Sequence, residues 1–147
     1  MLKKVKCADP SEENQPLFRV RPTKQARGEA EVGSLFQSNK EQLWVLRQLR
    51  LLRHWPLDKK QQDELESDLD FSKVTHRNAT FHELRLDDEH LHQKNLRVFF
   101  WVNDEDKAIW IIHAYWKKTN RLEDVVKTLV ARRIKNLKGA MQDGSIE

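Results

Sequence analysis

Charged side chains interrupt one strongly apolar stretch of this chain, which runs from Leu96 to Thr119. The stretch is rich in β-branched and aromatic residues. Apart from the polar segment 103–107 and Thr119, its polar exceptions are Arg97, His113, Lys117 and Lys118. Guanidinium and ammonium groups bind anions such as phosphate, and an imidazole can transfer a proton near neutral pH. If the fold brings them together, these residue types indicate chemistry on an anionic substrate.

The same stretch predicts a β-hairpin. Residues 96–102 and 108–119 are dense in strand-forming residues, and the polar residues 103–107 between them form a turn. Both halves are apolar at almost every position instead of alternating, so both faces should be covered and the hairpin should lie at the centre of a sheet. Residues 79–86 predict a further strand, which the polar loop 87–95 joins to the hairpin.

Two arginines should face each other across this sheet. Antiparallel pairing that places Leu86 opposite Leu96 also places Arg85 opposite Arg97. Like charges directly across a sheet are unfavourable, so the pair is easier to understand if an anion binds between them. The alternative, which is commoner for charged strand residues, is that each arginine pairs with a nearby carboxylate such as Glu83 or lies at a solvated edge.

The length of the turn decides which face carries His113. A five-residue loop, 103–107, places His113 across from Arg97 and puts Tyr115 and Lys117 on the same face, whereas a four-residue loop moves them to the other side. We favour the first, because the second would bury His113 and Lys117 among apolar side chains. A single histidine in an apolar strand is more often structural than catalytic. The core face would then comprise Ala108, Trp110, Ile112, Ala114 and Trp116.

The chain before residue 79 predicts one clear helix among weaker elements. Ser38 followed by Glu41 is a capping box, and an apolar stripe carries this helix to about His54. The stripe consists of Leu43, Leu46, Leu49 and Leu52, and it is widened by Val45, Trp44 and Leu51. Residues 17–21 predict a short strand, 23–32 a helical turn or two, and 58–69 a marginal surface helix or an ordered loop. Residues 1–16 are expected to form a mobile arm.

A second amphipathic helix follows the hairpin. Asn120 with Glu123 forms its capping box, and Gly139 should end it, leaving residues 140–147 as a frayed tail. Its apolar residues recur at helical spacing, and they are Leu122, Val125, Val126, Leu129, Val130, Ile134 and Leu137.

Composition limits the class of protein. The 147 residues suit a single domain, and 38% apolar with 34% charged residues is typical of soluble globular proteins. No apolar run approaches the roughly 18 residues that a membrane span needs, and the start of the chain does not resemble a secretory signal. The single cysteine, Cys7, favours a reducing compartment, so we expect the cytoplasm. No Cys/His cluster has metal-ligand spacing, so neither a metal nor a cofactor is expected.

Positive charge is concentrated in one part of the chain. Residues 113–138 contain eight basic and two acidic residues, a net charge of +6, whereas the whole chain carries +4. Cations hold phosphates and an aromatic ring can stack on a base, so a sheet face with these residues beside a basic helix would suit a nucleic acid. An acidic protein would be attracted to the same surface, and the sequence does not separate the two.

The order of these motifs resembles the RelE/ParE toxin superfamily, and most closely its HigB-like, phage-derived Gp49 branch. The resemblance covers roughly residues 80–138 and rests on Glu83-Leu84-Arg85, on 96–100, on 111–119, and on a helix with Arg132 and Arg133 in its later half. It implies a small α+β domain with an N-terminal strand, two helices, a twisted antiparallel sheet and a C-terminal helix. The chain departs from the family in Ala114, where the family has glycine, and in a longer acidic region at 56–78.

The resemblance also implies a function. It suggests a toxin of a type II toxin–antitoxin pair, commonly a ribosome-dependent endoribonuclease that cuts mRNA and is inhibited by a cognate antitoxin, for which we expect a small helix-turn-helix protein. Carried over by position, Arg85 and Arg97 would bind the phosphate, His113 would transfer protons, and Lys117 would stabilise charge. The residues expected to contact RNA are Lys118, Tyr115 and Arg121.

Two other functional classes remain open at this stage. The chain could be a ParE-like protein that acts on DNA gyrase, or a catalytically inactive relative that serves as a protein-interaction module. It could also be a structural domain, since no single motif in the sequence is enough to identify a catalytic site. The histidine and the four cations together favour the nuclease, whereas Ala114 and the longer 56–78 region leave room for the others.

Overall fold

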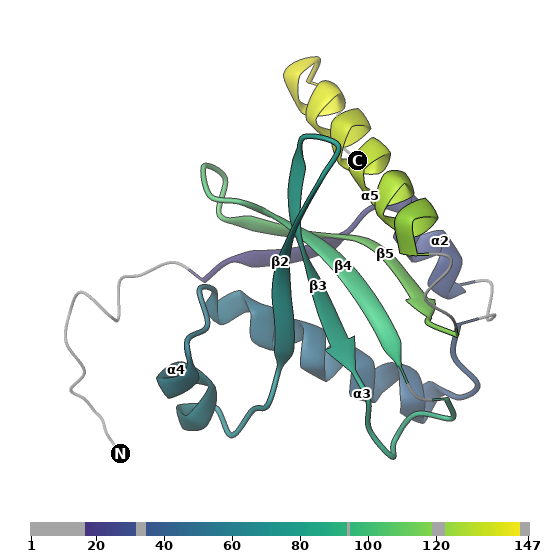
Figure 1. Cartoon of the computed structure of the whole chain (residues 1–147). Coiled ribbons are helices and arrows are strands. Elements are labelled where there is room, and N and C mark those ends of the chain that lie inside the picture. Colours follow the sequence, from purple (N-terminus) through teal and green to yellow (C-terminus); the bar gives the residue numbers. More distant parts are fainter. Residues whose placement is uncertain (1–16, 32–34, 94, 119–122, 145–147) are drawn as a thin grey trace.

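A five-stranded sheet with helices on both faces forms the body of the protein (Figure 1). The computed structural model describes residues 17–31, 35–93, 95–118 and 123–144. The elements are β1 (Arg19–Pro22), α2 (Lys24–Glu31), α3 (Asn39–Arg50), the 3₁₀ helix η1 (Leu51–His54), α4 (Lys59–Glu64), β2 (Asp70–His76), β3 (Ala79–Leu86), β4 (Leu96–Asn103), β5 (Ala108–Trp116) and α5 (Glu123–Gln142). The predicted α+β class is confirmed. The predicted mobile arm, 1–16, lies outside the described residues.

The strands lie in the order β1-β5-β4-β3-β2, so the predicted hairpin of β4 and β5 is central to the sheet. Neighbouring strands from β2 to β5 are antiparallel, but β1 runs parallel to β5, with Val20 beside Ile109. The expectation of a wholly antiparallel sheet is therefore wrong at this edge. A long connection allows parallel pairing, and here it passes through helices and three other strands before the chain returns to β1.

β2 is a strand that the sequence pattern did not predict, because residues 56–78 looked like an acidic insertion. It forms a hairpin with β3 across Arg77 and Asn78, both of which have positive φ, at 48° and 65°. Such a two-residue turn has the twist that suits antiparallel strands. Phe71 and Val74 lie three residues apart and so point to opposite faces, which hides the alternation typical of a strand.

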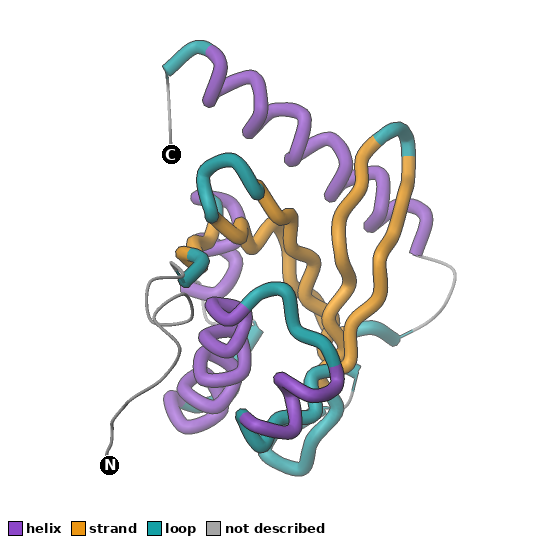
Figure 2. The backbone as a smooth tube through the Cα atoms, turned by 90° about the vertical axis from the view of Figure 1, so that its left-hand side faces the viewer, coloured by secondary structure: helices purple, strands orange, loops and turns teal. Residues whose placement is uncertain are grey.

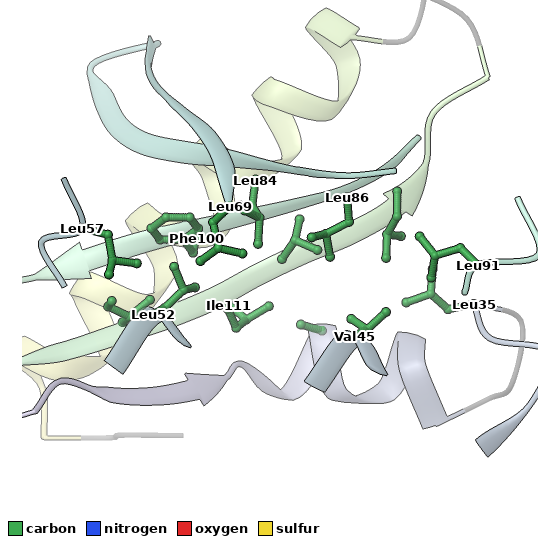
Figure 3. Packing of buried hydrophobic residues seen from close by; sticks show 14 of the residues in the cluster. Leu35, Val45, Leu52, Leu57, Leu69, Leu84, Leu86, Leu91, Phe100 and Ile111 are labelled. Carbon is green, nitrogen blue, oxygen red and sulfur yellow. The ribbon is translucent and has the colours of Figure 1, made fainter. Parts of the chain in front are cut away.

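Helices cover the sheet on two sides, as Figure 2 shows with the strands between them. One hydrophobic cluster joins the sheet to α2, α3 and η1, and Figure 3 shows part of it. A second cluster joins the opposite face of the sheet to α5 through residues such as Phe99, Trp110 and Ile134. The protein therefore has three layers, and in the described part of the chain α5 is the helix that packs on the face carrying Arg85 and Arg97.

The turn of the β4–β5 hairpin differs from the favoured register. Asn103 pairs with Ala108, so the loop has four residues and not five. A register shift between Phe99 and Phe100 then pairs Phe99 with His113. The shorter loop turns the first half of β5 over, and the bulge turns its second half back, because each shift by one residue exchanges the faces.

The predicted core face of β5 is consequently divided between the two clusters. Before the bulge, Ala108, Trp110 and Ile112 pack with the α5 cluster. After it, Ala114 and Trp116 pack with the cluster beside α3. The prediction that these five residues share one face is wrong, because the sequence carries no clear sign of the bulge.

α3 begins at the predicted cap, where the Ser38 hydroxyl accepts a hydrogen bond from the Glu41 amide at 3.2 Å. The Glu41 carboxylate makes other bonds than those of a capping box. It is buried, and it accepts from the Gln37 amide at 2.9 Å and from the amide and Nδ1 of His92, with Nδ1 at 2.6 Å. Glu41 therefore ties the loop between β3 and β4 to α3.

Replacing Glu41 should give a pH-dependent loss of stability. Burial raises the pKa of Glu41, but the hydrogen bonds from His92 and Gln37 outweigh it and leave the pKa below its usual value. The contribution of the carboxylate is thus complete above the ordinary pKa of 4.5 and is lost as the pH falls through the lowered one. We expect Glu41→Gln to reduce the free energy of unfolding by about 1–3 kcal/mol at neutral pH. Urea unfolding of both proteins should show this gap closing under acid, and a gap independent of pH would contradict the assignment.

The apolar stripe of α3 is only partly buried. Val45 and Leu52 are buried, whereas Leu43 and Leu46 are 55% and 48% exposed. The face that packs on the sheet therefore follows the Val45 side of the predicted stripe, and Leu43 and Leu46 lie outside it.

α5 extends past its predicted end. The helix continues through Gly139 to Gln142, so three residues of the expected tail are helical. Met141 packs against the second cluster, which gives the last turn a reason to form. The cap Asn120 lies outside the described residues, and Val125, predicted to be in the core, is 65% exposed.

Candidate functional site

The arginine pair predicted across β3 and β4 is present, with Arg85 directly opposite Arg97. Glu83 lies on the same face, two residues before Arg85, and shares its carboxylate between the two arginines. Its Oε2 is 3.3 Å from Nε of Arg97, and its Oε1 is 3.8 Å from Nη1 of Arg85. The structure thus shows the carboxylate pairing that the sequence left as an alternative.

Arg85 is held more firmly by the unpredicted strand β2. Its Nε and Nη2 donate to the two carboxylate oxygens of Asp70 at 3.0 and 2.8 Å, and its Nη1 donates to the Ser72 hydroxyl at 3.0 Å. The hydrogen bond from Arg85 lowers the pKa of Asp70. The Asp70 side chain is 65% exposed, so solvent screens this pair and an incoming anion can compete for it.

Arg97 is the more enclosed of the two arginines, with 12% of its side chain exposed. Its Nε is buried and, among the described residues, has no hydrogen-bond partner, because the nearby Glu83 oxygen forms an ion pair without the alignment of a hydrogen bond. A buried donor without a partner is uncommon in folded proteins. The face around Arg97 therefore has capacity to bind a further acceptor.

His113 lies on the same face but is bound to α5. It is buried, and Arg133 from α5 donates from Nη1 to the Ile112 carbonyl at 3.0 Å and to Nδ1 of His113 at 3.3 Å. A guanidinium only donates, so Nδ1 accepts and the neutral ring carries its proton on Nε2. In this state the imidazole can donate a hydrogen bond, but Nδ1 is occupied as a proton acceptor.

Tyr115 and Lys117 complete the face along β5. Tyr115 pairs directly with Arg97, and its ring stacks on His113 with centroids 5.6 Å apart. Burial, with smaller contributions from Glu123 and Glu83, raises the pKa of Tyr115 to about 12, so its phenol stays protonated. Lys117 forms an ion pair of 2.9 Å with Glu123 in the first turn of α5, and that bond lowers the pKa of Glu123.

Most of the predicted site residues come together, although not as first expected. Arg85, Arg97, His113, Tyr115 and Lys117 occupy one face, despite the wrong turn length, because the bulge restores the predicted face for the end of β5. The expectation that His113 lies opposite Arg97 is wrong, since Tyr115 takes that place. Lys118 is exposed at the end of the strand, and Arg121 lies outside the described residues.

Sequence reasoning missed the acidic half of the site. Glu83 was considered only as a possible ion-pair partner, and Asp70, Glu123 and Arg133 were not considered as site residues. Together, four cations (Arg85, Arg97, Lys117 and Arg133) face three carboxylates (Asp70, Glu83 and Glu123), which leaves a net charge of +1. Two early signals were Glu83 beside Arg85 in the sequence and Arg133 in the motif of the C-terminal helix, whereas Asp70 and Glu123 reach the site only through tertiary packing.

The described residues contain no group of three or more His, Cys, Asp or Glu side chains arranged to hold a metal ion. Within the same part of the chain, no helix combines the length and apolar character needed to cross a membrane.

Comparison with protein-family models and with curated proteins gives no match. Among solved structures, the chain is similar to a chain in the crystal structure of the archaeal RelE–RelB complex from Pyrococcus horikoshii OT3. The TM-score is 0.47 and the sequence identity is 23%, over 71% of this chain and 98% of that chain. At this level the similarity carries no argument about function, which must come from the site itself.

Proposed function

We propose that this chain is an RNA-cleaving toxin of the RelE/ParE superfamily, in its HigB-like branch, that acts in the cytoplasm on mRNA at the ribosome. A small helix-turn-helix antitoxin would neutralise it. One observation carries the proposal: Arg85 and Arg97 lie opposite each other, and Nε of Arg97 is buried without a hydrogen-bond partner among the described residues. A phosphate placed between the arginines would supply the acceptor that this donor lacks.

The reaction we assign to this site is attack of a ribose 2′-oxygen on the adjacent phosphorus. The bond from the 2′-oxygen to phosphorus forms, the bond from phosphorus to the 5′-oxygen breaks, and the products are a 2′,3′-cyclic phosphate and a 5′-hydroxyl. Arg85 and Arg97 stabilise the extra negative charge of the phosphorane. His113 donates a hydrogen bond from Nε2 to the same group, and Tyr115 stacks on a neighbouring base.

Two protons must move in this reaction, one from the 2′-hydroxyl and one to the 5′-oxygen. Glu83 is the carboxylate placed to accept the first. A phosphate that takes Arg85 and Arg97 as partners would release the Glu83 carboxylate from both ion pairs, so that its oxygens can accept the proton. The ammonium of Lys117, released from Glu123, supplies the second proton. No step requires a metal ion or a cofactor.

A second candidate function is that of an inactive relative or a gyrase-directed toxin of the ParE type. The charge balance favours it, because every cation of the cluster has a protein partner and the net charge is only +1. Such a cluster could hold β2, β4 and α5 together without any reaction. The difference between the two functions is whether an RNA phosphate displaces the internal carboxylates.

Controlled expression in growing bacteria tests the proposed function. Wild type should arrest growth with cleaved transcripts, and His113→Ala should relieve both effects. Arrest with intact mRNA and damaged DNA would support the gyrase-directed alternative. Absence of arrest would contradict the toxin assignment, whereas rescue by the product of an adjacent helix-turn-helix gene would support the antitoxin.

Asp70→Asn should tighten RNA binding, because it removes the internal anion that competes with phosphate for Arg85. An exposed pair of this kind is worth at most about 1 kcal/mol, so we expect a gain of about two- to fivefold in affinity. Fluorescence anisotropy with a 2′-O-methyl RNA, which cannot be cleaved by this route, measures binding alone. Asp124→Asn, at an exposed carboxylate on α5, is the matched control. Unchanged or weaker binding in Asp70→Asn would count against competition at Arg85.

A further inference from the structure

A second basic surface lies away from the cluster around Arg97, between the tip of the β2–β3 hairpin and α5. In Figure 1 the tip of this hairpin reaches the side of α5. The two elements enclose a groove of about 730 Å³. Arg77 and Asn78 line it from the hairpin, and Arg132, Lys135 and Lys138 line it from the helix. We name this the hairpin groove.

The charge of the hairpin groove is not compensated. Its lining contains four cations, Arg77, Arg132, Lys135 and Lys138, and no Asp or Glu among the described residues. None of the four forms an ion pair with a carboxylate in the described part of the chain. In this it differs from the cluster around Arg97, where Arg85, Arg97 and Lys117 form ion pairs with carboxylates. Uncompensated cations in a concavity attract polyanions.

The groove is also preformed. Thr128 of α5 binds both walls together, because its hydroxyl lies 3.0 Å from Nε2 of His76 and accepts from Nε of Arg77 at 3.3 Å. At the far end, the ammonium of Lys138 sits 5.3 Å from the centre of the Trp101 ring. Cations that are already positioned lose less freedom when an anion binds.

The spacing of the cations suits a chain of phosphates. Arg132, Lys135 and Lys138 recur every three residues, so they rise about 4.5 Å from one to the next along the helix axis. Arg77 faces this row from the opposite wall. We infer that the hairpin groove is a second RNA-binding surface, which holds the phosphate backbone at a distance from the reacting bond.

An acidic protein is the less suitable partner for this groove. Protein interfaces depend on a buried apolar or aromatic centre. The large hydrophobic residues that are exposed in the described chain, Leu17, Leu43, Leu46 and Val125, do not line it. Phosphate binding requires no such centre. The choice of RNA over DNA rests on the proposed function, whereas the choice of a phosphate backbone rests on the groove.

The groove and the Arg97 cluster are far enough apart to hold one RNA at two points. β3 runs from Ala79 at the groove to Arg85 at the cluster, and six residues of strand span about 20 Å. An RNA bound at both would extend over several nucleotides. The groove would therefore contribute to affinity and to the position of the backbone, but not to the bond-breaking step.

Binding of a labelled 2′-O-methyl RNA to the full chain tests the inference. The groove variant combines Arg132→Gln, Lys135→Gln and Lys138→Gln. The control variant combines Arg47→Gln, Arg53→Gln and Lys60→Gln, which are exposed cations of α3, η1 and α4 and lose the same charge. We expect the groove variant to bind the RNA at least about tenfold more weakly than wild type. The slope of the logarithm of its binding constant against the logarithm of the salt concentration should fall in magnitude by roughly two, whereas the affinity of the control variant should change less than about threefold.

Three results would overturn the inference that RNA binds in the hairpin groove. Equal weakening in both variants would show that only net charge counts, and unchanged binding in the groove variant would show that RNA does not use the groove; either overturns the inference. Displacement of the RNA by poly-glutamate as readily as by polyuridylate would point to an acidic protein instead and would also overturn it. Circular dichroism establishes that each variant is folded, and the single change Lys135→Gln, at an exposed position, repeats the test with minimal disturbance.

The binding assay, run beside a cleavage assay with unmodified mRNA on ribosomes, separates this inference from the proposed function. If the groove binds RNA but the proposed nuclease function is wrong, wild type binds RNA through the groove and leaves mRNA on the ribosome uncut. If only the nuclease is right, the RNA is cut and the groove variant binds as well as wild type.

Discussion

Arg97→Ala should reduce the rate of RNA cleavage by about 10²–10³-fold, the usual cost of removing one donor that stabilises a developing oxyanion. Arg97 is the best candidate for this effect because it is the more enclosed arginine and carries the unpartnered Nε. An assay with purified protein and ribosomes that carry a fluorescently labelled mRNA, under single-turnover conditions, measures the chemical step without product release.

The same substitution should also destabilise the fold, and the two effects must be separated. Removing Arg97 leaves the buried Glu83 carboxylate with only the more distant Arg85, at a cost of about 1–3 kcal/mol. Rates should therefore be normalised to the folded fraction. Arg19→Ala, an exposed arginine on β1, is the control and should retain full activity. A normalised rate for Arg97→Ala within threefold of wild type would refute the catalytic assignment.

The pairing of β3 with β4 could be predicted because the sequence constrains it locally. A short polar loop joins the two strands, and placing Leu86 opposite Leu96 aligns the apolar residues of both. The opposition of Arg85 and Arg97 follows directly. The ion pairing of the two arginines could not be predicted in the same way. The sequence shows Glu83 as a possible partner of one arginine, whereas the structure shows that both arginines share it.

Other parts of the site depend on contacts that a single sequence does not reveal. β2 is an edge strand with little alternation, so nothing indicated that Asp70 would reach Arg85. The bulge in β5 has no distinctive residue, yet it returns His113 to the arginine face. Arg133 lies beside the apolar stripe of α5, and only the packing angle of that helix shows that it reaches His113. These positions are set by tertiary packing, and periodicity reports only on single elements.

The two faces of α5 give a second large expected effect, on stability. Periodicity alone placed Ile134 and Val125 in one apolar stripe, but the structure separates them: Ile134 is 1% exposed and Val125 is 65% exposed. Ile134→Ala should remove about 2–5 kcal/mol from the free energy of unfolding, because it leaves a cavity beneath the helix. Val125→Ala should change it by no more than about 0.5 kcal/mol.

This comparison is internally controlled, since both changes replace a β-branched residue by alanine in the same helix. The gain in helix propensity is a few tenths of a kcal/mol at each position and largely cancels. For a domain of this size, each kcal/mol lowers the melting temperature by about 2–4 °C, so thermal unfolding resolves the two variants easily. Because α5 supplies Arg133 and Glu123 to the site, loosening it should also reduce RNA cleavage in Ile134→Ala. Equal destabilisation by both changes would mean that α5 does not pack on the sheet through the face assigned to it.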